Sequence, residues 1–203
     1  SEGVALTVVA CAPDGTLDPA QVLAALRPET RLVALCQASN VAGTLLPVAE
    51  IGRRLRACTL AQPLLLVDSA ASAGIVPIDI ERDAIDLLAF TGHKSLLGPT
   101  GTGGLILGRR VDPAQLRPLK RGGTGSLSEQ EEQPRFLPDA FESGTLNVAG
   151  LAGLDAGLRW LLAQDRAALR QQHAANTRRL LDGLGAIPGV TLFGPRDPAC
   201  QVD

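Results

Sequence analysis

The sequence predicts an α/β fold with a mostly parallel sheet and helices on both of its faces. Short, nearly continuous apolar segments alternate with stretches that have the period of amphipathic helices, which is the pattern of a sheet buried on both sides. Apolar residues make up 45% of the 203 residues, so a sizeable core can form. Aromatic residues make up only 2%, so leucine, alanine, valine and isoleucine must build that core.

Each expected strand is a short run of apolar or β-branched residues. These runs are residues 4–9, 31–36, 64–67, 86–90, 104–107 and 190–193. The expected helices carry start signals or an apolar stripe. One begins at Asp18, an N-cap followed by proline at the first helical position, and one begins at Pro47. Two longer helices are expected at residues 148–163 and 166–184.

The chain divides into two unequal parts. Residues 1–160 are expected to form part of a large domain, and residues 161–203 a linking helix and the start of a small C-terminal domain. Residues 120–138 have glycines, acids and prolines without an apolar period, which predicts a long exposed loop. The chain lacks methionine and begins in mid-pattern with Ser-Glu-Gly-Val, so we expect it to be a piece of a longer protein.

Composition excludes several classes of partner. The net charge of −2 gives no electrostatic basis for binding nucleic acid or an anionic membrane. No apolar run approaches the roughly 20 residues of a membrane span. The four cysteines show no Cys-x-x-Cys spacing, which argues against a zinc site or disulfides and favours a cytoplasmic protein. Cys36 and Cys58 are expected to be small buried hydrophobic residues.

Polar residues follow three neighbouring strands of the expected sheet. Asn40 comes after one strand, Asp68 ends the next, and Thr91, His93 and Lys94 follow a third. Ligands of open α/β sheets bind beyond the carboxyl ends of the strands. These side chains are therefore expected to converge on one crevice.

The glycine-rich run after Lys94 allows two interpretations. A nucleotide phosphate loop needs its lysine after the glycines, whereas Lys94 precedes them. The dinucleotide pattern fails too, because its third glycine position falls on Ile106. The other interpretation is an anchor for pyridoxal 5'-phosphate. This cofactor needs a lysine amine, a carboxylate beside its ring nitrogen, and donors for its phosphate and its phenolic oxygen, and the strand ends supply all of these.

The sequence also resembles a known family. The segments SNVAGTLLPVAEIG, LLLVDSAASAGIVPIDI, DLLAFTGHKSLLGPTGTGGL and FESGTLN, in this order, are similar to the class V aminotransferases, which are fold-type I pyridoxal-phosphate enzymes. Within that family they are most similar to the cysteine desulfurases and selenocysteine lyases. The resemblance implies a fold-type I large domain and a cysteine desulfurase-like activity, which releases sulfur from L-cysteine and leaves alanine. A sulfur-acceptor protein is then a possible partner.

The resemblance also implies roles for single residues. Lys94 matches the lysine that carries the cofactor, and Asp68 matches the partner of the pyridine nitrogen. Asn40 matches a donor to the phenolic oxygen, and Thr91 with His93 matches phosphate ligands. Thr145 matches a threonine that reaches the phosphate of the neighbouring subunit. A homodimer with shared active sites is therefore implied.

Each of these residues has a simpler alternative role. Asp68 could cap the end of its strand, Asn40 could be a turn residue, and His93 could orient Lys94 or face solvent. Thr145 could be the N-cap of the helix that follows. His173 is expected to lie on the surface. For Thr145 the two roles can hold together.

One position departs from the family pattern. The glutamine that commonly follows the ring-nitrogen aspartate by three residues is replaced by Ala71, with Ser69 and Ser72 nearby. This change weakens a specific desulfurase assignment more than it weakens cofactor binding. Two alternatives stay open: another aminotransferase or lyase of the family, and a cofactor-free fragment without activity of its own.

Overall fold

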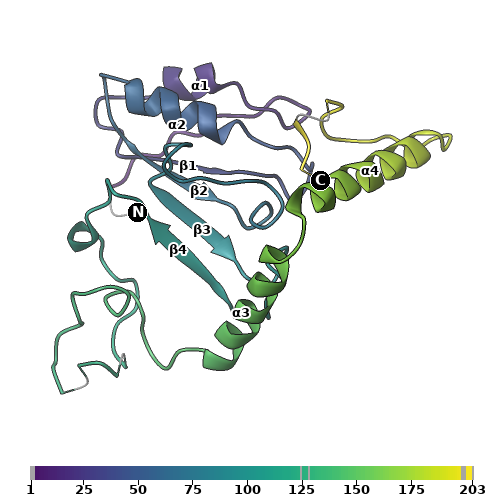
Figure 1. Cartoon of the computed structure of the whole chain (residues 1–203). Coiled ribbons are helices and arrows are strands. Elements are labelled where there is room, and N and C mark those ends of the chain that lie inside the picture. The colour runs from purple at the N-terminus through teal and green to yellow at the C-terminus, as the bar shows by residue number, and fades with distance from the viewer. Residues whose placement is uncertain (1–2, 124, 128, 198–199, 203) are drawn as a thin grey trace.

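The computed structural model describes residues 3–123, 125–127, 129–197 and 200–202, and its centre is a four-stranded sheet (Figure 1). The strands follow one another across the sheet in chain order: β1 (Leu32–Cys36), β2 (Leu64–Asp68), β3 (Leu87–Thr91) and β4 (Gly103–Leu107). The first three strands are parallel, and β4 runs antiparallel to β3. The predicted α/β class with a mostly parallel sheet is confirmed.

The helices begin where the sequence places their caps. They are α1 (Pro19–Ala24), α2 (Val48–Ala57), a 3-10 turn η1 (Pro113–Gln115), α3 (Val148–Leu162) and α4 (Arg166–Gly185). The Asp18 carboxylate accepts a hydrogen bond from the Ala20 N–H at 2.8 Å, so it caps α1 as predicted. In the described part of the chain, no helix is both long and apolar enough to cross a membrane.

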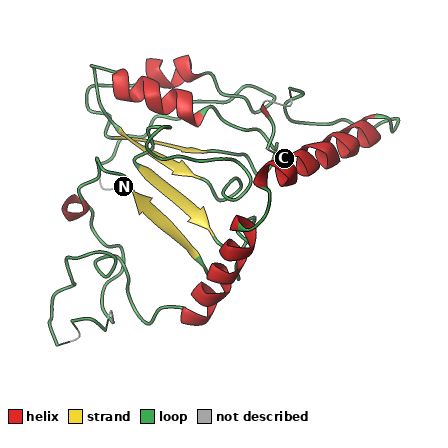
Figure 2. Ribbon diagram, viewed as in Figure 1, coloured by secondary structure: helices red, strands yellow, loops and turns green. Residues whose placement is uncertain are grey.

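The main core lies between α2 and the sheet. The apolar stripe of α2 includes Ile51 and Leu55, which pack with Leu65 and Val67 of β2. Ile51 and Val67 are completely buried. Figure 2 shows α1 and α2 side by side above the strands. Because side chains alternate along a strand, Leu64, Leu66 and Asp68 of β2 face the opposite side of the sheet.

The opposite face of the sheet is more open. The register pairs Leu32 of β1 with Leu64 of β2, and Leu105 of β4 with Ala89 of β3, so Leu32 and Leu105 point to this face. Leu32 is 48% exposed and Leu105 is 53% exposed. The helical cover of the described residues is therefore uneven, and the apolar surface of β1 and β4 lies partly in solvent.

Glycines allow α3 to lie directly against the loop that follows β3. A Cβ atom at Gly98 would lie 2.7 Å from a methyl group of Leu154, and one at Gly157 would lie 2.8 Å from the carbonyl oxygens of Leu96 and Leu97. Such distances leave no room for a side chain. The glycine-rich run thus serves close contact between the loop and the helix, and Leu96 and Leu154 form a second small core there.

Two predicted strands are wrong. Residues 4–9 are extended but pair with no strand, and Val4, Leu6 and Val8 are 81–85% exposed. Residues 190–193 are also irregular, with Phe193 86% exposed. Both predictions rested on β-propensity, which reports a fit to a half-buried surface and not an intrinsic backbone preference. Neither segment has a neighbouring strand in the described structure.

Asp86, just before β3, holds the far end of the sheet together. It is 2% exposed, and its carboxylate accepts hydrogen bonds from Arg56 at 3.1 Å, from Arg110 at 3.2 Å and from the Leu65 N–H at 2.9 Å. The cluster thereby links α2, β2 and the segment after β4. A buried carboxylate is stable only when its oxygens are satisfied in this way.

We expect Asp86→Ala to lower the free energy of unfolding by about 3 kcal/mol, because it orphans a buried N–H and separates two arginines from their shared partner. Urea denaturation measures the change. The matched control is Glu132→Ala, which breaks an exposed ion pair with Arg135 and should cost at most about 1 kcal/mol. Equal effects of the two substitutions would show that the Asp86 cluster does not stabilise the sheet.

Asp83 is a second buried carboxylate, and it lies in the segment between β2 and β3, three residues before Asp86. Burial raises the pKa of Asp83, but hydrogen bonds from Arg82 at 2.8 and 3.1 Å and from the Asp79 N–H at 3.1 Å outweigh it and lower the pKa below 3.8. The pKa is therefore lower in the folded than in the unfolded chain. The resulting stabilisation is present above the unfolded pKa and is lost as the pH falls through the folded pKa.

We therefore expect Asp83→Asn to reduce the loss of stability between about pH 5 and pH 2, measured as the free energy of unfolding by urea across that range. Arg82→Gln should act in the same direction, because without the guanidinium the folded-state pKa of Asp83 rises toward its unfolded value, and the stabilisation that is lost at low pH becomes smaller. A wild-type pH dependence in both variants would rule out this role for Asp83.

Candidate functional site

The parallel register places Asp68 and Thr91 at the carboxyl ends of two neighbouring strands. Asp68 is the last residue of β2, where it pairs with Cys36 of β1 and with Ala89 of β3. Thr91 ends β3 two residues after Ala89. Hydrogen bonds from the Gln37 N–H to the Asp68 carbonyl oxygen and from the Ser69 N–H to the Ala89 carbonyl oxygen, both 2.8 Å long, hold the strand ends level.

Asp68 has one carboxylate oxygen engaged locally. Its Oδ1 atom accepts a hydrogen bond from the Ala70 N–H at 2.8 Å, so the strand-capping role considered for Asp68 is present. The residue is exposed, and within the described residues it forms no ion pair. Capping therefore uses one oxygen and leaves the other oxygen for a ligand at the strand end.

Thr91 and His93 form a hydrogen-bonded pair. The distance between Thr91 Oγ1 and His93 Nδ1 is 2.8 Å. His93 is exposed, and Thr91 is half-buried. The contact orients the imidazole toward the strand end and leaves Nε2 for another partner. A hydroxyl and an imidazole held together in this way are a suitable donor set for a phosphate group.

Lys94 follows this pair at the start of the loop that packs on α3. The residue is exposed, and its carbonyl oxygen accepts a hydrogen bond from the Leu97 N–H at 2.9 Å. Leu97 has a φ of +61°, so the loop turns sharply directly after the lysine. The backbone of Lys94 is thus fixed while its amine stays accessible, as covalent attachment of a cofactor requires.

Asn40 and Thr145 lie outside this hydrogen-bonded group. Asn40 is exposed in the turn after β1, and the Ser39 hydroxyl, rather than Asn40, accepts the hydrogen bonds of that turn from Val41 and Ala42. Thr145 is exposed before α3. The N-cap of α3 is Asn147, which accepts from the Gly150 N–H at 3.0 Å, so the capping role considered for Thr145 is wrong.

The two serines near Ala71 do not replace the missing glutamine. The Ser69 hydroxyl donates to the Ala89 carbonyl oxygen at 2.8 Å, and the Ser72 hydroxyl donates to Gln37 Oε1 at 2.6 Å. Both serines are completely buried, and Gln37 is 6% exposed. Their donors point into the protein, so position 71 contributes no donor to the strand-end crevice.

Cys36 corrects the prediction that this cysteine is buried. It is exposed, whereas Cys58 is half-buried. Its neighbour in the register is Asp68. Partial desolvation of the thiol raises the pKa of Cys36, and the negative charges of Asp68 and Cys11 raise it further. The sequence does indicate that Cys36 lies beside Asp68, because each of these residues ends one of two adjacent strands. The exposure of Cys36 could not be predicted, because it depends on β1 being an edge strand of the sheet.

Known proteins share both the sequence and the fold. The aminotransferase class-V family model matches residues 1–202. The chain is 36% identical over 199 residues to a cysteine desulfurase of Dickeya dadantii, covering 96% of this chain and 47% of the relative. It is 36% identical over 198 residues to a probable cysteine desulfurase of Methanothermobacter thermautotrophicus, covering 95% and 48%.

Two solved structures are also similar. The apo structure of a cysteine desulfurase from Thermococcus onnurineus superposes with a TM-score of 0.78 at 28% identity, covering 97% of this chain and 48% of that one. A structure of SspA in complex with cysteine superposes with a TM-score of 0.64 at 27% identity, covering 77% and 40%. The chain spans about half the length of these relatives. It belongs to the class-V aminotransferase family.

Proposed function

We propose that the protein to which this chain belongs is a pyridoxal-phosphate-dependent cysteine desulfurase, which releases sulfur from L-cysteine and leaves alanine. The observation that carries the proposal is the alignment of Asp68 with the Thr91–His93 pair at one sheet edge, with Lys94 directly after that pair. The cysteine desulfurases among its relatives and the family to which it belongs support the same activity.

The residues of this crevice suit pyridoxal phosphate. Lys94 Nζ would bind the aldehyde carbon, the free oxygen of Asp68 would hold a proton on the ring nitrogen, and Asn40 would donate to the phenolic oxygen. Thr91 and His93 would donate to the phosphate. When bound, the cofactor supplies an electron sink that stabilises negative charge on the substrate's α-carbon.

The chain's own contribution to the reaction is binding and proton transfer. Once its amine is free, Lys94 Nζ would act as a general base that takes the proton from the substrate's α-carbon. Asp68 would hold a proton on the ring nitrogen through a charge-assisted hydrogen bond, whose net contribution is about 1.5–3 kcal/mol. Thr91 and His93 would fix the orientation of the cofactor by holding its phosphate.

The proposal extends to the organisation of the whole protein. Residues 1–160 would be part of the cofactor-binding domain, and residues 161–203 would link it to a small C-terminal domain. The exposed Thr145 would reach the phosphate of a neighbouring subunit, which requires a homodimer. A sulfur-acceptor protein and a cytoplasmic location stay predictions.

A specific observation favours a second function within the family. Ala71 removes a donor to the phenolic oxygen, and the inward hydrogen bonds of Ser69 and Ser72 leave nothing nearby to replace it. An aminotransferase or lyase that acts on another amino acid would fit this altered crevice. Product analysis separates the candidates, because only the desulfurase forms alanine from L-cysteine and leaves sulfane sulfur, which an added thiol reductant such as dithiothreitol releases as sulfide.

We expect borohydride reduction of the protein loaded with pyridoxal phosphate to attach the cofactor to Lys94 and not to Lys120. These are the chain's two lysines, so peptide mass spectrometry identifies the site directly. Lys94→Ala should lose the label, the yellow colour and the release of alanine from L-cysteine, whereas Lys120→Ala should keep all three. Labelling that survives in Lys94→Ala would reject Lys94 as the attachment site.

The position of Asp68 can be tested without the cofactor. Asp68→Asn removes a negative charge that raises the pKa of Cys36, so it should speed alkylation of Cys36 by iodoacetamide at pH 7. The expected increase is up to about fivefold, for a screened interaction of roughly 1 kcal/mol. Peptide-resolved mass spectrometry follows Cys36, with Cys58 as the internal control. An unchanged rate would place Asp68 too far from Cys36 to share its crevice.

A further inference from the structure

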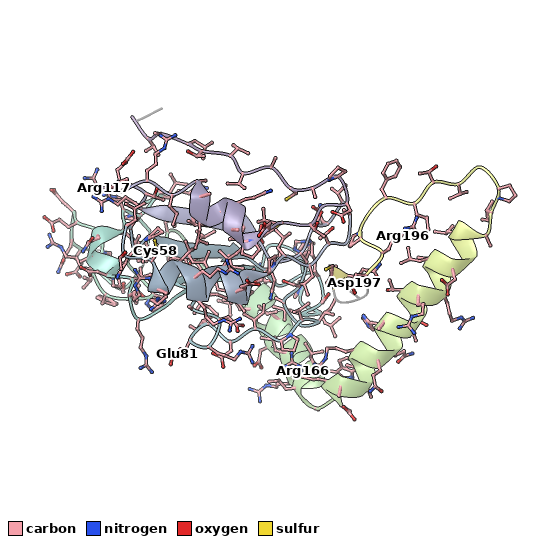
Figure 3. The ribbon with its side chains drawn as sticks, turned by 90° about the horizontal axis from the view of Figure 1, so that it is seen from above. Cys58, Glu81, Arg117, Arg166, Arg196 and Asp197 are labelled. Atoms are coloured by element: carbon pink, nitrogen blue, oxygen red, sulfur yellow. The ribbon has the colours of Figure 1, made fainter. Side chains whose placement is uncertain are left out.

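A separate cavity lies between the start of α4, the end of α3 and the loop after β3. Its volume is about 390 Å³, within the range of pockets that hold small organic ligands. Figure 3 labels Arg166 where α3 meets α4, at this cavity. Lys94 also borders it, whereas Asp68, Thr91 and His93 do not. The cavity therefore adjoins the proposed cofactor site through Lys94 and does not include its other predicted residues.

The floor and one wall of the cavity are apolar. Leu161 and Leu169 belong to the second small core, and the indole of Trp160 adds a flat aromatic surface that is half exposed. Covering such exposed apolar surface with a ligand is favourable by roughly 25 cal/mol per Å² of surface buried. An apolar or aromatic ligand body would fit this part of the cavity.

The remaining wall is basic. Arg166, Arg170 and His173 lie at positions i, i+4 and i+7 of α4, so they share one face of the helix, and all three line the cavity. No acidic residue lines the cavity in the described part of the chain, and neither arginine forms an ion pair there. The lining of the cavity therefore carries positive charge without an acidic residue beside it in the described chain.

We propose that this cavity binds a small organic anion with an apolar or aromatic body, such as an aryl or alkyl carboxylate. The carboxylate contacts Arg166 and Arg170, whose planar guanidinium groups suit two-point binding of a carboxylate. The body lies on Leu161, Leu169 and Trp160. The inference does not depend on the proposed desulfurase activity, because neither the cavity nor its charges require pyridoxal phosphate.

Trp160 provides the readout, because it is the only tryptophan of the chain. In cofactor-free protein we expect 4-phenylbutyrate to change the Trp160 fluorescence saturably at millimolar concentrations. The uncharged analogue 4-phenylbutan-1-ol should bind at least about tenfold more weakly, since it loses a charge-assisted interaction of about 1.5–3 kcal/mol. Acetate, which has the charge without the body, should produce no saturable change.

Two matched double variants locate the binding. Arg166→Gln with Arg170→Gln should weaken 4-phenylbutyrate binding about tenfold or more. Arg178→Gln with Arg179→Gln removes the same charge from the same helix outside the cavity and should leave binding unchanged. Circular dichroism checks that α4 stays helical in both.

Three results would overturn the proposal: no saturable change with 4-phenylbutyrate, equal binding of the alcohol, or equal loss of binding in both double variants. The comparison of acid with alcohol in the wild-type chain needs no variant, so it decides the matter even if a variant fails to fold. Loss of cofactor attachment at Lys94 would refute the proposed function and would leave this result unchanged.

Discussion

The parallel pairing of β2 with β1 and β3 is the constraint on which the rest of the structure depends. In a parallel pair the carboxyl ends of both strands lie at the same edge, and the residues just beyond them share one crevice. The register between Asp68 and Ala89 therefore decides how Asp68 lies relative to Thr91. A slip of one residue would turn Asp68 to the face that α2 covers and would bury a charge in the core.

The two ends of the strands differ in how their charged side chains are used. At the amino end of β3, Asp86 is buried and accepts hydrogen bonds from two arginines and the Leu65 N–H. At the carboxyl ends of β2 and β3, Asp68, His93 and Lys94 are exposed, and Asp68 keeps an oxygen without a partner among the described residues. Charges that stabilise a fold are paired, whereas charges that serve a ligand are left available. The contrast is what the proposed cofactor site at the strand ends would require.

The sequence predicted those features that depend on local chemistry. The Asp18 cap, the stripe of Ile51 and Leu55, and the strands β1 to β4 lie within about a residue of their expected bounds, because periodicity and capping act over a few residues. It failed for residues 4–9 and 190–193, whose β-propensity does not provide a strand of the described sheet to pair with. It also failed for Cys36, whose exposure depends on β1 being an edge strand. The roles of Asn40 and Thr145 stay predictions, since no contact in the described structure joins them to Asp68 or Thr91.

The replacement of glutamine by Ala71 is built into the turn after β2 and is not a local loss that a rotamer change could repair. Ser72 could reach the crevice only by leaving Gln37 Oε1, an acceptor in a residue that is 6% exposed. Ser69 would have to leave the Ala89 carbonyl oxygen. Orphaning a buried polar group costs about 1–3 kcal/mol, comparable to what a new hydrogen bond to the cofactor would contribute. Any compensating donor must therefore come from outside this turn.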